Sequence, residues 1–529
     1  MPILAEARPF LGRQIGEGFD RVFFVMTEPS TLFSSPTAPR LSKSKFLAGL
    51  QCLKRVYLEV HHPQLASPPD ASTQAMLDMG IEIGELARSL FPGGVNIGES
   101  HRQREAALAR TISVINDLTV PAIFEGAFEH DGVLVRVDIL HRIEGEPGGR
   151  HAWRLIEVKS SSRVKDVHLD DLAIQRYVLQ GGGIHVTTMC LMHINTQYLY
   201  QGGDIDLQAL FTLEDVSQAV TERGLLVPDR LAAMKSAVMQ SEAPSVQPDR
   251  HCHTPYECPF WAHCTTDKPP RWVYHLPGSK QTVSQLIEQG ISTIDEIPDG
   301  TKLSLVQRRV KDNVEWISPK LRAVLESVQY PVHHLDFETV MLAIPRFPST
   351  RPYQALPVQW SNHIERETGE VAHQEFLHTD ASDPRKVLVE SLIDSLGNEG
   401  SICVYSHYEQ SILEQLMEVL PSFRPALTNI VSRLWDLHQA VYGYYYHPGF
   451  GGSYSLKFVL PALIPSLGYD DLEIKEGGQA ASEYYKMVFL ETDWIERAKI
   501  EEALREYCKH DTLAMVELRR ALKEKARLA

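Results

Sequence analysis

The sequence lacks both an apolar run long enough to cross a membrane and an excess of basic charge. A membrane-spanning helix needs about 20 consecutive apolar residues. No uninterrupted stretch approaches this length, so we expect no membrane partner. The 52 Lys and Arg residues are outnumbered by 68 Asp and Glu, which gives a net charge of −16. This balance argues against a protein that coats nucleic acid nonspecifically, but it is compatible with metal sites built from carboxylates.

Cysteine is also scarce, with 7 residues in 529, and the first 26 residues mix acids and bases unlike a secretory signal. We therefore expect a cytoplasmic location, where clustered cysteines indicate a metal site more often than disulfides. Four cysteines form a pattern, one near the start and a Cys-x5-Cys-x5-Cys run in HCHTPYECPFWAHC: Cys52, Cys252, Cys258 and Cys264. The others are expected to be small buried side chains: Cys190, Cys403 and Cys508.

Length and local composition predict several domains. The apolar fraction of 43% and the charged fraction of 23% are ordinary for a globular protein, and 529 residues correspond to roughly three domains. Residues 27–40 are rich in Pro, Ser and Thr, so we expect a disordered leader. The resulting division is a leader over 1–40, a first domain over 41–268, a helical connector over 269–328 and a last domain over 329–529.

A first group of candidate catalytic residues lies on two predicted strands. Residues 133–140 (VLVRVDIL) alternate like a half-buried strand, and RLIEVKSS follows after a turn-rich segment. Glu157 and Lys159 are two residues apart and share one face of the second strand. If the strands pair, Asp138 lies close to both. Asp138 and Glu157 can then hold Mg²⁺ or Mn²⁺, while the Lys159 ammonium orients or activates the attacking water.

These residues resemble a known nuclease signature. Asp-x18-Glu-x-Lys is the pattern of the PD-(D/E)XK nucleases. The segment DDLAIQRYVLQ is predicted to be a helix with Asp170 and Asp171 in its first turn. It carries Gln175 and Tyr177, which resemble the glutamine–tyrosine motif of RecB-type nucleases. The resemblance implies that Gln175 orients water or phosphate; the Gln-x-Tyr spacing differs from the usual Gln-x-x-x-Tyr, which leaves the role of Tyr177 open.

Together with the four cysteines, this region resembles the iron–sulfur subfamily of RecB-like nucleases. The resemblance implies a 4Fe–4S cluster on Cys52, Cys252, Cys258 and Cys264, and activity on single-stranded or end-opened DNA. The early histidine of many members is missing from GIEIGELARSLFPGG, where Glu82 and Glu85 are the candidate replacements. The alternative is a structural zinc site that includes one of three histidines, His251, His253 or His263.

Two other segments have open interpretations. The stretch RLSKSKFLAGLQCLKRVYLEVHH carries five basic residues against Glu59, and it is either a solvated helix face or a track for phosphates: Arg40, Lys43, Lys45, Lys54 and Arg55. The connector contains QLIEQGI-STIDEIPD, which loosely resembles a helix-hairpin-helix element that grips a DNA backbone. A structural connector between two domains is the alternative for that segment.

A second group of candidate residues lies in the C-terminal part. PVHHLDFETV is a predicted strand on which Asp336 and Glu338 share a face. IERAKIEEALREYCKHDTLAMVELRRAL is a predicted amphipathic helix in which Tyr507 and Asp511 are four residues apart on one side. Two-metal phosphodiester hydrolysis uses acids that bridge ions about 4 Å apart and a hydroxyl that positions water, and this group supplies both.

This arrangement resembles the tyrosine variant of the DEDD exonucleases, which belong to the RNase H-like superfamily. Their first motif is Asp-x-Glu and their third is Tyr-x3-Asp. In the place of the second motif, VYSHYEQSIL offers Glu409, with Asp436 as the alternative ligand. GGSYSLKFVL resembles the segment before the last motif, which implies that Lys457 contacts the substrate.

The whole chain resembles a bacterial family that fuses an iron–sulfur RecB-like nuclease to an RNase H-like exonuclease domain. The expected fold class is α/β, with a PD-(D/E)XK nuclease fold, a helical connector and an RNase H-like (DnaQ-like) fold. The expected function is Mg²⁺- or Mn²⁺-dependent hydrolysis of DNA at two sites, the second a 3′→5′ exonuclease, with single-stranded DNA as partner. A nucleic-acid-binding protein with an inactive site and an RNA-processing exonuclease are the alternatives. A helicase or a repair or defence partner does not follow from the motifs.

Overall fold

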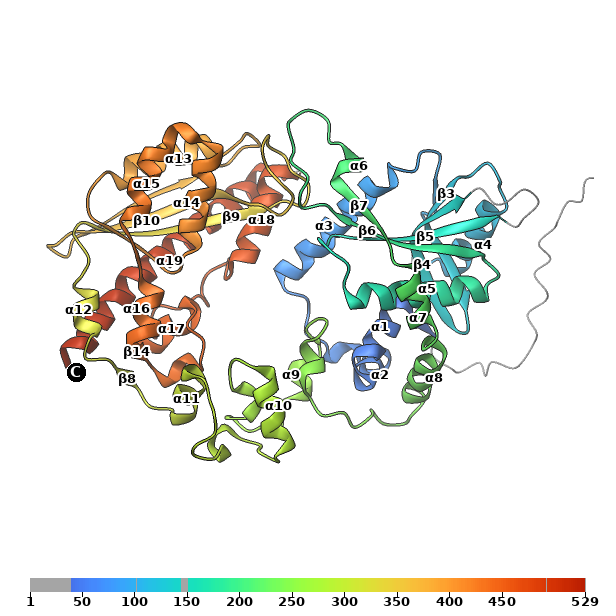
Figure 1. The fold of residues 1–529 in the computed structure, drawn as a ribbon, viewed down its shortest axis with the longest axis horizontal. Coiled ribbons are helices and arrows are strands. Elements are labelled where there is room, and N and C mark those ends of the chain that lie inside the picture. The colour runs from blue at the N-terminus through green and yellow to red at the C-terminus, as the bar shows by residue number, and fades with distance from the viewer. Residues whose placement is uncertain (1–39, 101, 144–150, 491, 529) are drawn as a thin grey trace, which may run out of the picture. The chain divides into compact units, whose positions relative to one another are not determined.

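The computed structural model describes residues 40–100, 102–143, 151–490 and 492–528. Except for Arg40, the predicted leader lies outside the described residues. The described part is mixed α/β, with one large sheet in its N-terminal half, another in its C-terminal half, and helices throughout (Figure 1). None of the helices in these ranges combines the length and the apolar character needed to cross a membrane.

The first sheet contains both strands that were predicted to carry catalytic residues. Its order is β2-β3-β4-β5-β6-β7, and β1 pairs with β4. Neighbours β3, β4 and β5 are antiparallel, whereas β6 runs parallel to β5. The strands are β1 (Leu41–Ser42), β2 (Val95–Asn96), β3 (Ala122–His130), β4 (Val133–Ile143), β5 (Ala152–Lys159), β6 (Val186–Ile194) and β7 (Phe211–Asp215). The predicted strands and their pairing are therefore confirmed.

Helices pack against this sheet through apolar side chains. Val133, Val135 and Val137 of β4 are buried in one cluster with Leu172 and Val178 of α5, as alternation along a strand predicts. The helices are α1 (Lys43–Gln51), α2 (Leu53–His61), α3 (Ala71–Arg88), α4 (Arg104–Ile115), α5 (Asp166–Gly181), α6 (Leu207–Leu210), α7 (Ser217–Gly224) and α8 (Val227–Val238). Helix α5 begins earlier than predicted, so Asp171 lies in its second turn instead of its first.

The middle segment is made of short elements that share a core with the C-terminal part. Val283, Leu286 and Val310 are buried in one cluster with Leu437 and Leu518, and β8 pairs with β14. Its elements are α9 (Trp261–Cys264), α10 (Lys280–Glu288), α11 (Leu305–Asp312), β8 (Trp316–Ile317) and α12 (Leu321–Leu325).

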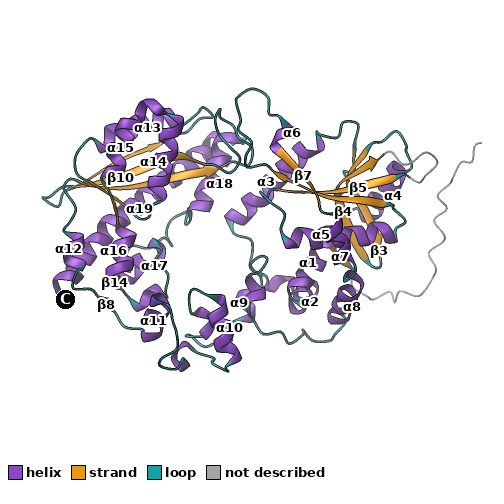
Figure 2. Cartoon of the chain, in the orientation of Figure 1, coloured by secondary structure: helices purple, strands orange, loops and turns teal. Residues whose placement is uncertain are grey.

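The second sheet is a mixed sheet of five strands with β9 at its centre. Its order is β11-β10-β9-β12-β13; β10 is antiparallel to β9 and β11, and β12 is parallel to β9 and β13 (Figure 2). The strands are β9 (Val332–Met341), β10 (Ala355–Glu365), β11 (Val371–Leu377), β12 (Ser401–Val404) and β13 (Leu434–Asp436), with β14 (Tyr445–Tyr446) outside the sheet.

The two faces of β9 meet different helices. Leu335 and Phe337 are buried in a cluster with apolar residues of α13, α14 and α15, so Asp336 and Glu338 face the other side, where α19 packs. The predicted stripe of α19 is confirmed, since Ile500, Leu504, Cys508, Met515 and Leu518 are buried. The helices are α13 (Arg385–Leu396), α14 (Tyr408–Val419), α15 (Arg424–Ser432), α16 (Leu437–Tyr444), α17 (Leu456–Leu463), α18 (Gly477–Phe489) and α19 (Trp494–Leu528).

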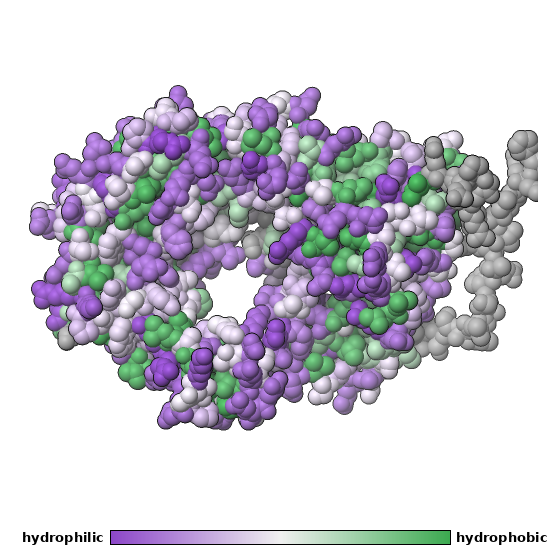
Figure 3. Space-filling view, viewed as in Figure 1, coloured by the Kyte–Doolittle hydropathy of each residue, from purple (hydrophilic) through white to green (hydrophobic). Residues whose placement is uncertain are grey.

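The surface is mixed in polarity. Among the described residues on the face drawn in Figure 3, hydrophobic side chains lie in small groups between hydrophilic ones. A surface of this kind fits a chain whose apolar residues are mostly used in the clusters around its two sheets.

Candidate functional sites

The first candidate site is a buried cluster of carboxylates on β4, β5 and α5. Val158 N donates to Asp138 Oδ2 at 2.8 Å, which fixes the Asp138 carboxylate against β5. Glu157 is 1% exposed. Gln175 Nε2 donates to Glu157 Oε2 at 2.7 Å and to Asp171 Oδ1 at 2.9 Å. The structure therefore brings the predicted residues Asp138, Glu157 and Gln175 together and adds Asp171.

Two lysines supply positive charge to this cluster. Lys159 Nζ lies 2.6 Å from Glu157 Oε1 and 2.9 Å from Asp171 Oδ2. Lys43 Nζ, from the first residue of α1, lies 2.9 Å from Glu157 Oε1 and 3.3 Å from Asp171 Oδ1. Buried carboxylates require such compensation. Three carboxylates and two ammonium groups leave the cluster short of positive charge.

The electrostatics distinguish the carboxylates from one another. Burial, together with the neighbouring Glu157 carboxylate, raises the pKa of Asp138 to about 7. Burial also acts to raise the pKa of Glu157, but Lys159 and Lys43 outweigh it and hold that pKa below its usual range. Burial and Glu157 together raise the pKa of Asp171. Asp138 is thus protonated part of the time at neutral pH, and a cation that binds there would displace this proton.

Sequence reasoning missed Lys43 and the direct role of Asp171. Lys43 belongs to a basic stretch for which a solvated helix face was one interpretation, but its ammonium is part of the cluster. Asp171 was placed only as a helix-start residue. The other predicted neighbours lie elsewhere: Tyr177 Oη donates to Asp131 Oδ2 at 3.1 Å. The described hydrogen bonds and ion pairs of Glu82 and Glu85 include no residue of the cluster, so neither is supported as the replacement for the missing histidine.

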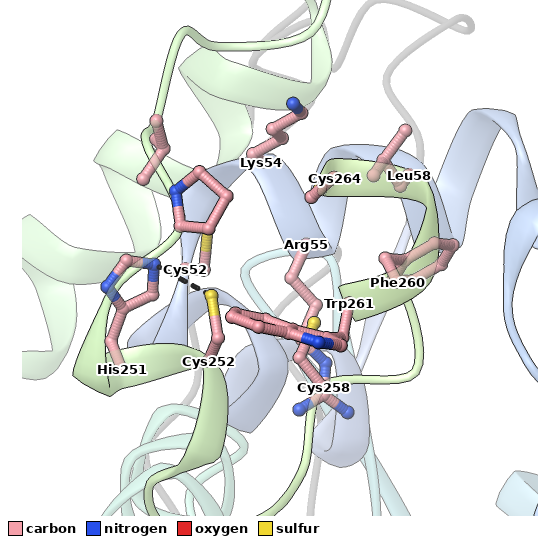
Figure 4. A pocket seen from close by; sticks show the side chains of 12 residues that line it. Cys52, Lys54, Arg55, Leu58, His251, Cys252, Cys258, Phe260, Trp261 and Cys264 are labelled. Carbon is pink, nitrogen blue, oxygen red and sulfur yellow. Dashed lines mark hydrogen bonds between the residues drawn. The ribbon is translucent and has the colours of Figure 1, made fainter. Parts of the chain in front are cut away.

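The four patterned cysteines line one cavity. Figure 4 shows Cys52, Cys252, Cys258 and Cys264 around it, with Trp261 and Phe260 on its apolar side. Cys52 is the extended residue between α1 and α2, and the other three come from the loop that ends in α9. Gln51 Nε2 donates to the carbonyls of His251 (2.6 Å) and Tyr256 (2.8 Å), which joins the two segments.

The spacing of these thiols bears on what they can hold. No three sulfur or histidine nitrogen atoms of this cavity lie within 4.8 Å of one another in the described structure. A tetrahedral zinc ion with bonds of about 2.3 Å would bring its sulfur ligands to roughly 3.8 Å. In an iron–sulfur cluster each thiolate binds a different iron, so the sulfurs lie farther apart. The four cysteines of this cavity form a donor set that could hold a metal group.

Of the three histidines near the cysteines, His251 lines the cavity and the other two do not. His251 Nε2 lies 3.6 Å from Cys252 Sγ. His253 instead pairs with Glu257, and His263 is exposed. Burial raises the pKa of Cys252 to about 11, and the Cys258, Cys52 and Cys264 thiols act in the same direction. A bound metal group would therefore have to displace protons from these thiols.

The second candidate site lies between β9, α14 and α19. Ligand atoms of Asp336, Glu338 and Cys508 lie within 4.8 Å of one another, so this group can hold a metal ion. Cys508 Sγ is 3.9 Å from Asp336 Oδ2. Cys190 and Cys403 are buried apolar residues as predicted, whereas Cys508 is buried but lies beside the acids.

Burial, followed by repulsion between neighbouring carboxylates, raises the pKa values in this second cluster. Burial raises the pKa of Asp336 well above its usual range, and the Asp511, Glu338 and Glu409 carboxylates raise it further. Burial and Asp511 do the same for Glu338. Burial raises the pKa of Asp511 to about 6, although its hydrogen bonds with Tyr469 and Tyr507 oppose this change. Within the described residues none of the four acids forms an ion pair, and such a buried excess of negative charge favours a cation.

Glu409 and Asp436 occupy different positions in this cluster. Glu409 is 4% exposed in the first turn of α14 and acts electrostatically on Asp336. Burial raises its pKa to about 7, and Asp436 contributes in the same direction. The Asp436 carboxylate instead accepts from Gln439 N at 3.1 Å and caps α16. The geometry therefore favours Glu409 as the residue beside Asp336.

Two tyrosines and a lysine surround Asp511. Tyr507 is buried next to it, and burial together with Asp511 raises the pKa of this phenol. Tyr469 donates a hydrogen bond to Asp511 Oδ1; it lies in the loop between α17 and α18 and no pattern in the sequence indicated it. Lys457 Nζ is 5.9 Å from the centre of the Tyr469 ring and lowers the pKa values of Glu338 and Asp511. Lys457 is thus a described cation that acts electrostatically on the cluster.

Fold and sites define a mixed α/β chain with two buried acidic clusters and a four-cysteine cavity. The family model described as Domain of unknown function (DUF2779) matches residues 333–455. This segment includes Asp336, Glu338, Glu409 and Asp436, and it ends before Tyr507 and Asp511. No curated protein matches the chain.

Proposed function

We propose that this chain is a metal-dependent nuclease that hydrolyses phosphodiester bonds of DNA. The observation that carries the proposal is a group of four buried or half-buried acids that form no ion pair within the described residues: Asp336, Glu338, Glu409 and Asp511. Carboxylates assembled in this way bind the divalent cations used in phosphodiester hydrolysis. The central position of β9 in a mixed sheet supports the proposal of an RNase H-like fold for this part.

At the second site, the side chains of this protein would bind the metal ion and orient the attacking water. Bound Mg²⁺ or Mn²⁺ would supply Lewis-acid stabilisation and an activated water. Asp336, Glu338, Glu409 and Asp511 would be its ligands, and Tyr469 would hold Asp511 in a fixed orientation through its hydrogen bond. The Tyr507 phenol keeps its proton at neutral pH because burial and Asp511 raise its pKa, so it would position water by donating or accepting a hydrogen bond.

At the first site we propose a PD-(D/E)XK-like nuclease centre. Asp138 and Glu157 would bind the metal ion, and Lys159 would hold a positive charge beside the scissile phosphate. The antiparallel strands β4 and β5 that carry these residues, followed by α5 with Gln175, support this assignment. The position of the four cysteines around one cavity supports a 4Fe–4S cluster there.

The experiment that tests the function is incubation of the chain with end-labelled DNA and RNA. Matched single-stranded oligonucleotides, labelled at the 3′ or the 5′ end, are treated with Mg²⁺, Mn²⁺ or a chelator. We expect metal-dependent cleavage of DNA with stepwise shortening from the 3′ end. Preference for RNA would favour the RNA-processing alternative, and binding of both polymers without cleavage under either metal would contradict the nuclease.

A specific observation favours a second candidate function. In the first cluster Lys43 and Lys159 already contact Glu157 and Asp171, which is an arrangement compatible with a nucleic-acid-binding module whose first site is inactive. The variant Asp511→Asn distinguishes a nuclease with two active sites from a protein whose first site is inactive, because it leaves the first site as the remaining source of cleavage. Residual metal-dependent cleavage by this variant supports two active sites.

A further inference from the structure

A cavity of about 230 Å³ lies between α12 and the last turns of α19, away from both acidic clusters. Figure 1 shows α12 beside the C-terminal part of α19. Its charged lining consists of four cations and one carboxylate: Arg322, Arg519, Lys523, Arg527 and Glu326. A cavity with this charge attracts anions.

Arg519, at the base of the cavity, has unused hydrogen-bond donors. Its side chain is 1% exposed, and Nη1 pairs with Glu365 Oε2 at 2.6 Å. Nε and Nη2 are buried and have no hydrogen-bond partner among the described residues. Arg520 Nε also pairs with Glu365, at 3.1 Å from Oε1. Buried donors of a charged group are costly to leave unpaired, so an acceptor that reached Arg519 from the cavity would lower this cost.

Lys523 adds a second cation without a carboxylate partner in the described structure. Its Nζ donates to Tyr330 Oη at 3.0 Å and lies 5.5 Å from the ring centre. Burial acts to raise the pKa of Tyr330, but Lys523 and Arg519 outweigh it and lower this pKa. The outer cations are already paired, Arg322 with Glu326 (2.9 Å) and Arg527 with Glu524 (2.6 Å). Lys523 is therefore the lining cation without a carboxylate partner in the described structure, and Arg519 contributes its remaining donors.

We propose that this cavity binds a phosphate group, either inorganic or carried by a mononucleotide. A guanidinium presents its donors in a fork that matches phosphate oxygens, and an ammonium adds a point charge. The volume of about 230 Å³ is below the roughly 300–1,000 Å³ of pockets for larger ligands. Arg519 follows Asp511 by eight helical residues, about 12 Å along α19, so the site is separate from the second acidic cluster.

Binding to the full chain tests the proposal, in a buffer containing a chelator so that divalent ions cannot recruit phosphate to the acidic clusters. Inorganic phosphate and a nucleoside 5′-monophosphate are titrated separately by calorimetry at constant ionic strength. We expect saturable binding at one site, weakened about tenfold by Lys523→Ala because a charge-assisted contact is lost. The matched control is Lys525→Ala on the same helix, whose ammonium pairs with Glu315 outside the cavity (2.8 Å); we expect a change of less than about twofold.

The two ligands identify the source of the phosphate. Equal affinities indicate recognition of the phosphate group alone, and tighter binding of the nucleotide indicates added contacts to its sugar or base; both support the site. The variant Arg519→Lys keeps the charge but removes the fork, so we expect weaker binding with an unchanged unfolding midpoint. If that variant fails to fold, the two lysine variants decide the matter. Nonsaturable binding by the wild type, or equal losses in Lys523→Ala and Lys525→Ala, would overturn the proposal.

Discussion

At the scale of single residues, the first acidic cluster contains two ammonium groups with the same partners but different positions in the chain. Lys159 follows Glu157 by two residues on β5, whereas Lys43 reaches Glu157 from the first residue of α1. Only Lys159 is fixed to the strand that carries the proposed metal ligand. We therefore assign the transition-state role to Lys159 and a charge-compensating role to Lys43.

Replacing Lys159 by Ala is expected to slow cleavage while metal stays bound. The ammonium would act on charge that develops in the transition state, and loss of such a group costs about 10²–10³ in rate. The measurement is the rate on single-stranded DNA in an Asp511→Asn background, with Mn²⁺ affinity determined in parallel. Cleavage at the rate of the Asp511→Asn parent would count against the role of Lys159.

Replacing Lys43 by Ala is expected to tighten Mn²⁺ binding at the first site about tenfold, which corresponds to about 1.4 kcal/mol. The ammonium contacts Glu157 and Asp171 (2.9 and 3.3 Å) and competes electrostatically with a divalent cation. Lys45→Ala on the same helix is the matched control. Calorimetric titration in the Asp511→Asn background gives the affinity, and an unchanged or weaker affinity in Lys43→Ala would show that the lysine does not oppose the metal.

Glu409→Gln and Asp436→Asn should differ in their effects on stepwise cleavage. Glu409 acts electrostatically on Asp336, and misplacement of a reacting group by about 1 Å can cost about 10²-fold in rate. Asp436 caps α16, and Asn caps a helix about as well as Asp. In a Glu157→Ala background we expect Glu409→Gln to lose about 10² in 3′→5′ rate and Asp436→Asn to lose little. The reverse order would make Asp436 the ligand.

At the scale of elements, α1 links the cysteine cavity to the first acidic cluster. Lys43 begins the helix and Cys52 follows its last residue, Gln51, which is tied to the cysteine loop. Lys54 and Arg55 of the same basic stretch line the cysteine cavity. The positive charge of this segment is therefore divided between two sites. The interpretation of the segment as a solvated helix face did not predict this division.

Replacing one cysteine should distinguish cysteines that bind a metal group from cysteines that remain free thiols. Cys258→Ala is expected to lose iron, about four atoms per chain in the anaerobically purified wild type, and to lower the unfolding midpoint because the cysteines connect distant segments. Cys190→Ala, which replaces a buried cysteine outside the cavity, should keep the iron. Iron analysis and thermal unfolding are the measurements; stoichiometric zinc without iron in the wild type would contradict the cluster.

At the scale of the whole molecule, the strands and the long helix could be predicted because their signals are local. Alternation located β4 and β5, and helical spacing located the buried stripe of α19. The Asp-x-Glu pair on β9 has its acids on the face away from Leu335 and Phe337, as strand periodicity requires.

Other site residues depend on contacts between segments far apart in the sequence. Lys43 reaches Glu157 across 114 positions, and Tyr469 meets Asp511 from an irregular loop. Asp171 was displaced from its predicted turn because α5 begins at Asp166. Cys508 was predicted only as part of the buried apolar stripe of α19. No other feature of the sequence indicated that it lies beside Asp336. Periodicity describes one element at a time and does not report which elements meet.

The central claim is that the two acidic clusters are metal-dependent nuclease sites. The most direct measurement compares the wild type with Glu157→Ala, Asp511→Asn and the double variant on 3′- and 5′-labelled single-stranded DNA, with Mg²⁺ or Mn²⁺. We predict that Glu157→Ala keeps stepwise 3′→5′ products that form faster with Mn²⁺, that Asp511→Asn keeps the activity of the first site, and that the double variant is inactive. Undiminished cleavage by the double variant, or no cleavage by the wild type with either metal, would contradict the account.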